Sequence, residues 1–330
     1  MTTFKEIRGN LIKSTSTDPA NPQEGQIWYN STSQVLKGEE ILGAWSSGGN
    51  LGTAKDGIGS VGTQTAGLGF GGYNPTPVVV TDTEEYDGSA WTAGGTMNTA
   101  RSLLEGFGIQ TNAVATGGNL VAGSPSPAPA PVYTNAVEEY NGTSWTTVTP
   151  LATGRFLLAA AGVQTAGMAI GGRVSDTSFT NATEEYNGSS WTAGGSMNTP
   201  APLSSAIGGC GTLTAGLKFG GPAPTTNTEE YNGTSWTEVN NLNTGRDNMK
   251  GAGIQTSALA IGGNPNIAAT ESYDGTSWTA VSDLATGRNN IAGTGSSNTS
   301  ALAFGGNIPP KTAATEEFSF APATRTFTTS

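Results

Sequence analysis

Few side chains of this 330-residue chain could perform acid–base or nucleophilic chemistry. The sequence contains no histidine, and its single cysteine, Cys210, lies between two glycines. A thiolate nucleophile needs a base such as histidine to activate it, so we expect Cys210 to be a buried structural residue. Asp82 and Asp176 lie in segments of variable length, but nothing near them in the sequence indicates a raised pKa. The sequence therefore predicts a protein that is not an enzyme, with no catalytic residues, metal site or cofactor.

Two columns of charged residues recur along the chain. The basic column consists of Arg101, Arg155, Arg246 and Arg288, with Lys55 as the counterpart in the first copy. The acidic column consists of Glu84, Glu138, Glu184, Glu229, Glu271 and Glu316. A ring of charged ligand contacts is one interpretation. A residue present in nearly every copy is more typical of architecture, so we expect each arginine to bind a carboxylate or a backbone carbonyl and to lock the repeats together.

A second group of residues could bind a ligand: Tyr73, Tyr133, Arg173 and Phe179. All four lie in segments whose length differs from copy to copy. Aromatic rings beside polar groups suit a sugar-binding surface because the rings stack on the C–H faces of sugars, and they also suit a protein contact. We take these residues as the candidate ligand-binding positions.

The elements that position these residues form a repeat of about 45 residues, present in six imperfect copies. Each copy has a Gly pair, at Gly71-Gly72, Gly117-Gly118, Gly171-Gly172, Gly220-Gly221, Gly262-Gly263 and Gly305-Gly306. A ring residue follows, at Tyr86, Tyr140, Tyr186, Tyr231, Tyr273 and Phe318. The tryptophans of the repeat are Trp45, Trp91, Trp145, Trp191, Trp236 and Trp278, which we expect to be structural.

Both the strands and the turns can be read from this repeat. Large residues alternate with small ones before each Gly pair, as in Met168-Ala169-Ile170, which predicts a strand covered on both faces. An Asn-Gly or Asp-Gly pair separates each Tyr from the next Trp, as in Asn141-Gly142. These pairs favour a tight type I′ hairpin, so the Tyr and Trp segments should be adjacent antiparallel strands.

Length variation is concentrated in one class of connection. The Trp lies 26 residues before the first Gly of the pair in four copies, whereas the distance from the second Gly to the ring residue ranges from 10 to 22. We expect these variable connections to emerge on one face of the protein, where recognition usually occurs. The longest contains a Pro-rich stretch, residues 123–131, which reads either as a stiff arm or as a tolerated insertion.

Composition and charge restrict the function further. Charged residues make up 12% of the chain, and the net charge is −11. The 14 Lys and Arg residues are dispersed, which disfavours nucleic-acid binding. No apolar stretch has the length of a membrane span, and the first residues lack a signal-peptide core, so we expect no membrane insertion.

The order of Gly pair, Tyr and Trp, with a basic residue upstream, resembles the kelch repeat from Trp45 to Phe318. The resemblance implies an all-β fold: a six-bladed kelch-like β-propeller with four-stranded blades. Because Trp45 precedes the first Gly pair and no Trp follows Phe318, we expect the N-terminal Trp45 strand to close the last blade. Residues 324–327 are an alternative for that strand. Kelch-type copper oxidases need histidine ligands, which this chain lacks.

The segment Gly25-Gln26-Ile27-Trp28-Tyr29-Asn30-Ser31-Thr32, followed by Leu36-Lys37, resembles elements of tailed-phage virion proteins, especially those of marine phages. We therefore expect residues 1–40 to be an N-terminal extension with a small hairpin that docks to other virion proteins, and residues 41–330 to be the propeller.

The two resemblances together imply a non-enzymatic structural or recognition protein of the virion, assembled in the host cytoplasm. Its expected partners are a host-surface glycan or receptor on the variable loops, other virion proteins, and further copies of itself in the particle. Two alternatives stay open. One is a glycan-active enzyme on a propeller scaffold, and the other is a purely architectural head-decoration or tail component. The position in the particle, whether tail fibre, tail ring or head, also stays open.

Overall fold

A computed structural model describes residues 12–20, 26–76, 78–121, 133–175, 177–198, 207–221 and 225–327. These residues form strands and connecting loops, and none of them lies in a helix. The structure divides into an N-terminal unit, Met1–Ala44 with Phe320–Ser330, and a repeat unit, Trp45–Ser319. Residues 320–330 are thus grouped with the N-terminal residues, whereas the sequence analysis assigned them to the propeller.

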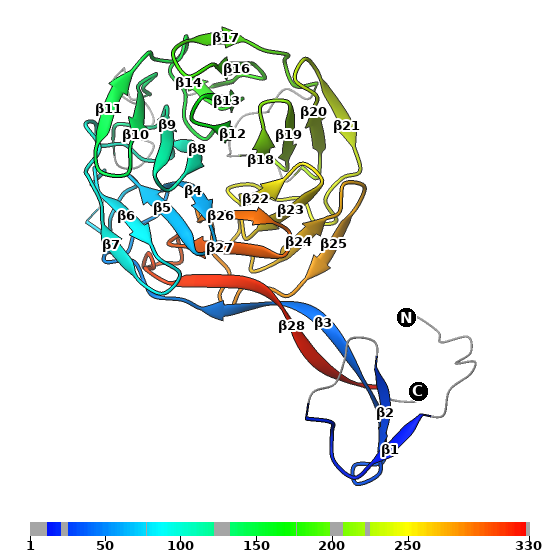
Figure 1. The fold of residues 1–330 in the computed structure, drawn as a ribbon. Helices are drawn as coiled ribbons and strands as arrows, with labels where there is room; N and C mark the ends of the chain where they lie inside the picture. Colours follow the sequence, from blue (N-terminus) through cyan, green and yellow to red (C-terminus); the bar gives the residue numbers. More distant parts are fainter. Residues whose placement is uncertain are drawn as a thin grey trace. The chain divides into compact units, whose positions relative to one another are not determined.

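The repeat unit is built from repeated four-stranded antiparallel sheets (Figure 1). The first three are β4 (Gly59–Thr63), β5 (Ala66–Phe70), β6 (Thr83–Tyr86), β7 (Trp91–Ala93); β8 (Glu105–Ile109), β9 (Asn112–Thr116), β10 (Val137–Tyr140), β11 (Trp145–Val148); and β12 (Ala159–Val163), β13 (Ala166–Ile170), β16 (Thr183–Tyr186), β17 (Trp191–Ala193). The next two are β18 (Gly208–Thr212), β19 (Ala215–Phe219), β20 (Thr228–Tyr231), β21 (Trp236–Val239); and β22 (Lys250–Ile254), β23 (Ser257–Ile261), β24 (Thr270–Tyr273), β25 (Trp278–Val281).

The last sheet has six strands, in the order β1-β2-β3-β28-β27-β26. Its strands are β1 (Lys13–Thr15), β2 (Ile27–Asn30), β3 (Val35–Ser47), β26 (Ala292–Ser297), β27 (Ser300–Phe304) and β28 (Thr315–Phe327). In the repeat unit the sheets stand around a common centre with β4, β8, β12, β18, β22 and β26 innermost (Figure 1). The fold is therefore all-β and propeller-like.

The core lies between neighbouring sheets. On β13, Met168 and Ile170 pack in a cluster that includes Tyr231 of the following sheet, while Ala169 packs in a cluster with Phe107 of the preceding one. These side chains are almost completely buried. The predicted alternation of large and small residues is confirmed, and it allows each sheet to be covered closely on both faces.

The predicted hairpins between the Tyr and Trp strands are confirmed, but the predicted turn type is wrong. In the first sheet Tyr86 pairs with Trp91, which leaves four residues in the loop. Gly88 has a φ of +91°, whereas Asp87 has no positive φ, so a type I′ turn does not form around the Asp-Gly pair. Instead the Asp87 carboxylate accepts hydrogen bonds from the backbone N–H groups of Ser89 and Ala90, both at 2.8 Å.

The tryptophans join neighbouring sheets through a threonine. Trp145 Nε1 donates to Thr83 Oγ1 at 2.9 Å, from the outer strand of one sheet to the third strand of the preceding one. Trp191 is the exception: Val137 occupies the threonine position, and the indole donates instead to the carbonyl of Thr149 at 3.1 Å. The regular bond also joins Trp45 to Thr270, Trp91 to Thr315, Trp236 to Thr183 and Trp278 to Thr228.

The tyrosines make a second set of contacts between sheets. Tyr140 donates from its hydroxyl to Glu85 Oε1 of the preceding sheet at 2.6 Å. At the last repeat both partners differ, because Phe318 has no hydroxyl and Ser272 stands where the other sheets have the accepting glutamate. The remaining pairs are Tyr86 with Glu317, Tyr186 with Glu139, Tyr231 with Glu185 and Tyr273 with Glu230.

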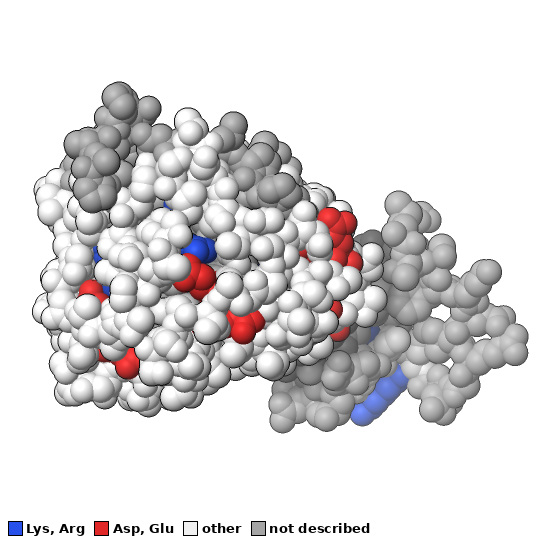
Figure 2. All heavy atoms as spheres, turned by 90° about the horizontal axis from the view of Figure 1, so that it is seen from above, with Lys and Arg blue, Asp and Glu red and all other residues white. Residues whose placement is uncertain are grey.

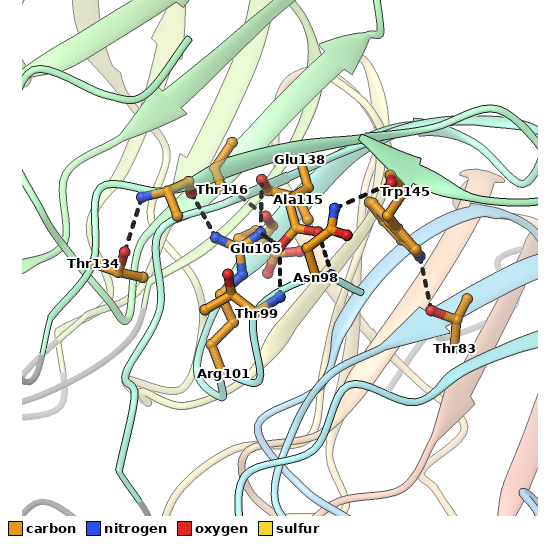
Figure 3. Close-up of polar contacts among 11 residues, drawn as sticks. Thr83, Asn98, Thr99, Arg101, Glu105, Ala115, Thr116, Thr134, Glu138 and Trp145 are labelled. Carbon is orange, nitrogen blue, oxygen red and sulfur yellow. Dashed lines mark hydrogen bonds and ion pairs between the residues drawn. The ribbon is translucent and has the colours of Figure 1, made fainter. Parts of the chain in front are cut away.

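The basic and acidic columns form buried ion pairs (Figure 3). Arg101 Nη2 lies 3.1 Å from Glu138 Oε1, and both side chains are fully buried. The Glu138 carboxylate also accepts from the backbone N–H of Asn98 at 2.7 Å, three residues before Arg101. Each pair therefore fastens the connection that enters its sheet. The corresponding pairs are Lys55–Glu84, Arg155–Glu184, Arg246–Glu271 and Arg288–Glu316.

The fourth sheet supplies its cation from a different position. Residues 199–206, where the arginine of this copy would fall, contain neither Lys nor Arg in the sequence and lie outside the described part of the chain. Lys218 of β19 replaces the small residue found at this place in other sheets, and its Nζ lies 3.2 Å from Glu229 Oε1. Both side chains are buried, so the ion pair is kept although the arginine is not.

The first and last copies of the repeat contact each other directly. β26 lies beside β4. Ser60 Oγ of β4 donates to the carbonyl of Gly293 at 2.9 Å, and Thr294 Oγ1 of β26 donates to the carbonyl of Gly62 at 2.5 Å. Hydroxyl groups thus connect the two innermost strands at this boundary.

In the N-terminal unit the predicted hairpin is confirmed: β2 pairs antiparallel with the start of β3, from Ile27 with Gly38 to Asn30 with Val35. Asp18 organises this unit by accepting hydrogen bonds from Trp28 Nε1 at 3.0 Å and from Lys37 Nζ at 2.6 Å. The bond to Lys37 is the largest cause that lowers the pKa of Asp18 to about 2.

Candidate functional site

The loop face of the repeat unit is formed where the second strand of each sheet ends. Gly71 and Gly72 have positive φ values of +63° and +95°, which turn the chain out of β5. In five copies, the residue after the Gly pair then forms a β-bridge with the residue after the basic column. These bridges are Asp56 with Tyr73, Ser102 with Asn119, Phe156 with Arg173, Asp247 with Asn264 and Asn289 with Asn307. The position after the basic column and the position after the Gly pair both vary between copies. The β-bridges place these two positions side by side.

Three of the four candidate residues meet on this face in an aromatic cluster, which consists of Tyr133, Phe156, Arg173 and Phe179. The rings of Tyr133 and Phe156 are stacked, with centroids 5.1 Å apart and planes inclined by 6°. The Arg173 guanidinium lies 5.5 Å from the Phe156 centroid and 5.9 Å from the Phe179 centroid. The cluster thus brings a cation within 6 Å of two ring centroids, and a third ring stacks on one of these rings.

Local structure explains why these side chains converge. Arg173 and Phe179 pair across a small hairpin of β14 (Arg173–Ser175) and β15 (Ser178–Phe179). Arg173 Nε donates to the carbonyl of Ser175 at 3.0 Å, which orients the guanidinium. Phe156 is only 1% exposed and forms the base of the cluster, while the other three side chains are half-buried. The arrangement offers ring surface and polar groups together.

Tyr73 belongs to a separate group on the loop face, which we call the lysine clasp: Asp56, Tyr73 and Lys311. Lys311 Nζ lies 3.2 Å above the Tyr73 ring centroid and 2.9 Å from Asp56 Oδ1. Burial is the main cause that raises the pKa of Tyr73 to about 12. Because Lys311 comes from the last copy of the repeat and Asp56 from the first, the clasp joins these two copies, and Tyr73 is already engaged.

Backbone hydrogen bonds link neighbouring copies of the repeat at the centre of the loop face, in the part of the chain that the structure describes. Leu103, with φ +52°, donates its N–H to the carbonyl of Gly57 at 2.7 Å, and Leu157, with φ +56°, donates to the carbonyl of Leu103 at 2.9 Å. Asn290 continues this collar by donating to Asn248 at 2.9 Å. The collar residues line a cavity of about 40 Å³.

Phe156 and the lysine clasp were missed by the sequence analysis. Both depend on the residue directly after the basic column, which is Asp56, Ser102, Phe156, Asp247 and Asn289 in successive described copies. The variation of this position beside the nearly constant basic residue was the signal in the sequence. Only the β-bridges show that the variable position lies next to the loops of variable length. The Pro-rich residues 123–131 and Asp176 lie outside the described residues.

Other chemistry is sparse in the described part of the chain. No group of three or more His, Cys, Asp or Glu residues there is placed to hold a metal ion. Cys210 is buried, as expected, and burial raises the pKa of its thiol to about 12. None of the described residues forms a helix long and apolar enough to cross a membrane.

Comparisons with known proteins give no family assignment. No protein-family model matches the chain, and no curated protein matches its sequence significantly. The loop face and its aromatic cluster are therefore the basis on which a function can be argued.

Proposed function

We propose that this chain is a non-enzymatic recognition protein of a tailed-phage particle and that its loop face binds a carbohydrate of the host surface. The observation that carries the proposal is the aromatic cluster of Tyr133, Phe156, Arg173 and Phe179. The half-buried rings of Tyr133 and Phe179 offer apolar faces that stack on sugar C–H groups, and the guanidinium carries N–H donors for sugar oxygens.

The composition of the chain favours an uncharged polar ligand. Only 12% of the residues are charged, and Figure 2 shows charged side chains that are few and separated on one view of the molecule. Acidic and basic groups of the repeat are largely consumed in buried pairs such as Arg101–Glu138. Stacking and neutral hydrogen bonds are therefore the main interactions that this surface can supply.

The scaffold that we propose is a closed six-bladed propeller of the kelch type, with the Trp45 strand as the outer strand of the last blade. Trp45 donates to Thr270 at 3.1 Å in the same way as other tryptophans of the repeat bind their threonines. The bond between Tyr86 and Glu317 and the lysine clasp support contact between first and last blades. A closed ring holds the loops rigidly, which lowers the entropy lost on binding.

Attachment to the particle is assigned in this proposal to the N-terminal unit. The support is the resemblance of residues 25–37 to segments of phage virion proteins, together with the division of the structure into two units. Virion partners would bind this unit while the loop face remains available to the host.

The proposal is tested by incubating the purified protein with capsular polysaccharide and lipopolysaccharide from candidate host bacteria and measuring both binding and released oligosaccharide. We expect saturable binding without release. Tyr133→Ala and Phe179→Ala should each weaken binding about tenfold, since base- or ring-stacking contacts contribute on the order of 1–3 kcal/mol. Thr111→Ala, in an exposed turn between β8 and β9, is the matched control and should bind as the wild type does.

Two results would contradict the proposal. Release of oligosaccharides would identify an enzyme, and absence of binding to every glycan from a bacterium that the phage infects would exclude recognition through carbohydrate. Equal binding by the Tyr133 and Phe179 variants would place the site elsewhere on the protein.

A further inference from the structure

An ion pair crosses the centre of the repeat unit. Glu105 is the first residue of β8, and Lys250 is the first residue of β22. Lys250 Nζ is paired with Glu105 Oε2, and Glu105 Oε1 accepts a hydrogen bond from the N–H of Gly106 at 2.9 Å. The two side chains are 14% and 9% exposed for Glu105 and Lys250, so the pair is largely removed from water.

The two strands that carry this pair lie on opposite sides of the central channel. β8 is next to β4 and β12, whereas β22 is next to β18 and β26. Two innermost strands therefore separate β8 from β22 in either direction. Two cavities lie along the channel, one of about 100 Å³ and the collar cavity of about 40 Å³, and Glu105 and Lys250 line both. The pair consequently divides the channel between these cavities.

The other copies of the repeat do not have charged residues at this position. The residues that start or align with the start of the other innermost strands are Gly59, Ala159, Gly208 and Ala292. Small residues are therefore sufficient to build the channel wall. Glu105 and Lys250 replace the small residue at this position. Their charges are opposite, and they lie in two copies that face each other.

A buried ion pair of this kind adds little net stability, because removing both charges from water costs about as much as their attraction returns. The pair has a stronger effect on alternative arrangements of the repeats. An arrangement that separates the two residues leaves a buried charge without a partner, which is costly. Alternatives are numerous here: the repeats share the same pattern of strand residues, so a sheet can pack beside the wrong copy or exchange with another chain.

We propose that Glu105 and Lys250 specify the order of the ring: they make the second and fifth copies of the repeat face each other and so disfavour misordered and chain-exchanged assemblies. This inference rests on the closed ring of the proposed function. It assigns the pair a role in the selection of one assembly rather than in binding or in stability.

The experiment compares the wild type with Glu105→Lys, the charge swap E105K/K250E and the double variant E105A/K250A. Each full-length protein is unfolded in denaturant, refolded at several concentrations, and analysed by size-exclusion chromatography with light scattering. After refolding, we expect the wild type and the charge-swap variant to have the same molecular mass in solution as untreated protein. The double-alanine variant should retain its denaturation midpoint but form a several-fold larger fraction of higher-mass species, increasing with protein concentration.

The variants separate this inference from the proposed ring. Glu105→Lys should lower the denaturation midpoint, and the swap should restore it because the two residues are in contact. A swap that does not restore the midpoint contradicts the pairing and with it the closed ring. A swap that does restore it, together with a double-alanine variant that refolds like the wild type at every concentration, contradicts only the role of the pair in assembly.

Discussion

Val137 occupies the place at which the other sheets have a threonine that accepts a hydrogen bond from a tryptophan. Valine and threonine have nearly the same shape, so the packing is preserved while the acceptor is lost. The effect is visible in Trp191, which donates to a backbone carbonyl, whereas Trp145 and Trp236 bind Thr83 and Thr183. A single hydroxyl group thus determines which acceptor the indole of the outer strand binds.

Replacement in both directions tests this contact. Thr83→Val should lower the free energy of unfolding by about 1–3 kcal/mol, because the buried indole N–H of Trp145 is left without an acceptor. Val137→Thr should raise the free energy of unfolding by about 0.5–1 kcal/mol by offering Trp191 a hydroxyl. Urea titrations followed by tryptophan fluorescence measure both changes. The interpretation is wrong if Thr83→Val unfolds at the wild-type midpoint.

The tyrosine–glutamate contacts predict instability at alkaline pH. Burial, followed by the hydrogen bond to Glu85, raises the pKa of Tyr140 to about 12, from an ordinary value of 10.0. A raised pKa in the folded state means that the stabilisation is complete below pH 10 and is lost as the pH rises through 12. We expect cooperative unfolding in this interval, monitored by tyrosinate absorbance and circular dichroism.

Tyr140→Phe is the matched variant for that measurement. It keeps the ring and removes the ionisable hydroxyl, so its stability should depend less on pH in the alkaline range, although it loses one hydrogen bond at neutral pH. Ionisation of the tyrosines without any change in circular dichroism would contradict a role of these hydroxyls in holding the sheets together.

At the scale of single elements, β19 shows how a missing repeat residue is replaced. Lys218 reaches Glu229 from the second strand of the sheet, although the other cations approach from the connection that precedes the first strand. Burial lowers the pKa of Lys218, and the neighbouring Glu229 opposes this effect. All these sheets have a cation beside the buried glutamate. The position in the chain that supplies the cation can differ.

Lys218→Met should therefore be strongly destabilising. It leaves Glu229 buried without a cation, which costs about 3–5 kcal/mol in proteins where one partner of a buried pair is removed. The double variant K218M/E229Q should recover part of this loss because the buried charge is also removed. Thermal unfolding measures both. If K218M alone melts with the wild type, the ion pair has no structural role in this sheet.

The elements also show what the sequence could predict. Strands, hairpins and their order follow from the alternation around Met168 and from the constant Asn-Gly spacing, because these patterns depend on local geometry. The turn type did not follow, because the Asp87 side chain replaces a backbone acceptor. The aromatic cluster could be predicted only in part, since the contact of Arg173 with Phe156 joins residues that are distant in the sequence and depends on how two connections pack.

At the scale of the whole molecule, a pair of truncations tests the proposed role of the Trp45 strand. A chain that begins at residue 44 retains the part of β3 that belongs to the repeat unit, and we expect it to fold. A chain that begins at residue 48 lacks this part and should aggregate or melt at a lower temperature, because an edge of β28 is exposed. Deleting residues 321–330 should leave the repeat unit folded. Equal melting temperatures for the two N-terminal truncations would contradict the proposed ring closure.

The pairing of β3 with β28 has a consequence for synthesis of the chain. The first residues of these strands are about 280 positions apart, so the outer strand is synthesised well before its partner. At typical rates of about 5–20 residues per second, the Trp45 segment waits for about 14–56 s before β28 emerges from the ribosome. During that time the five intervening sheets can form in order, and β3 pairs with β28 only after them.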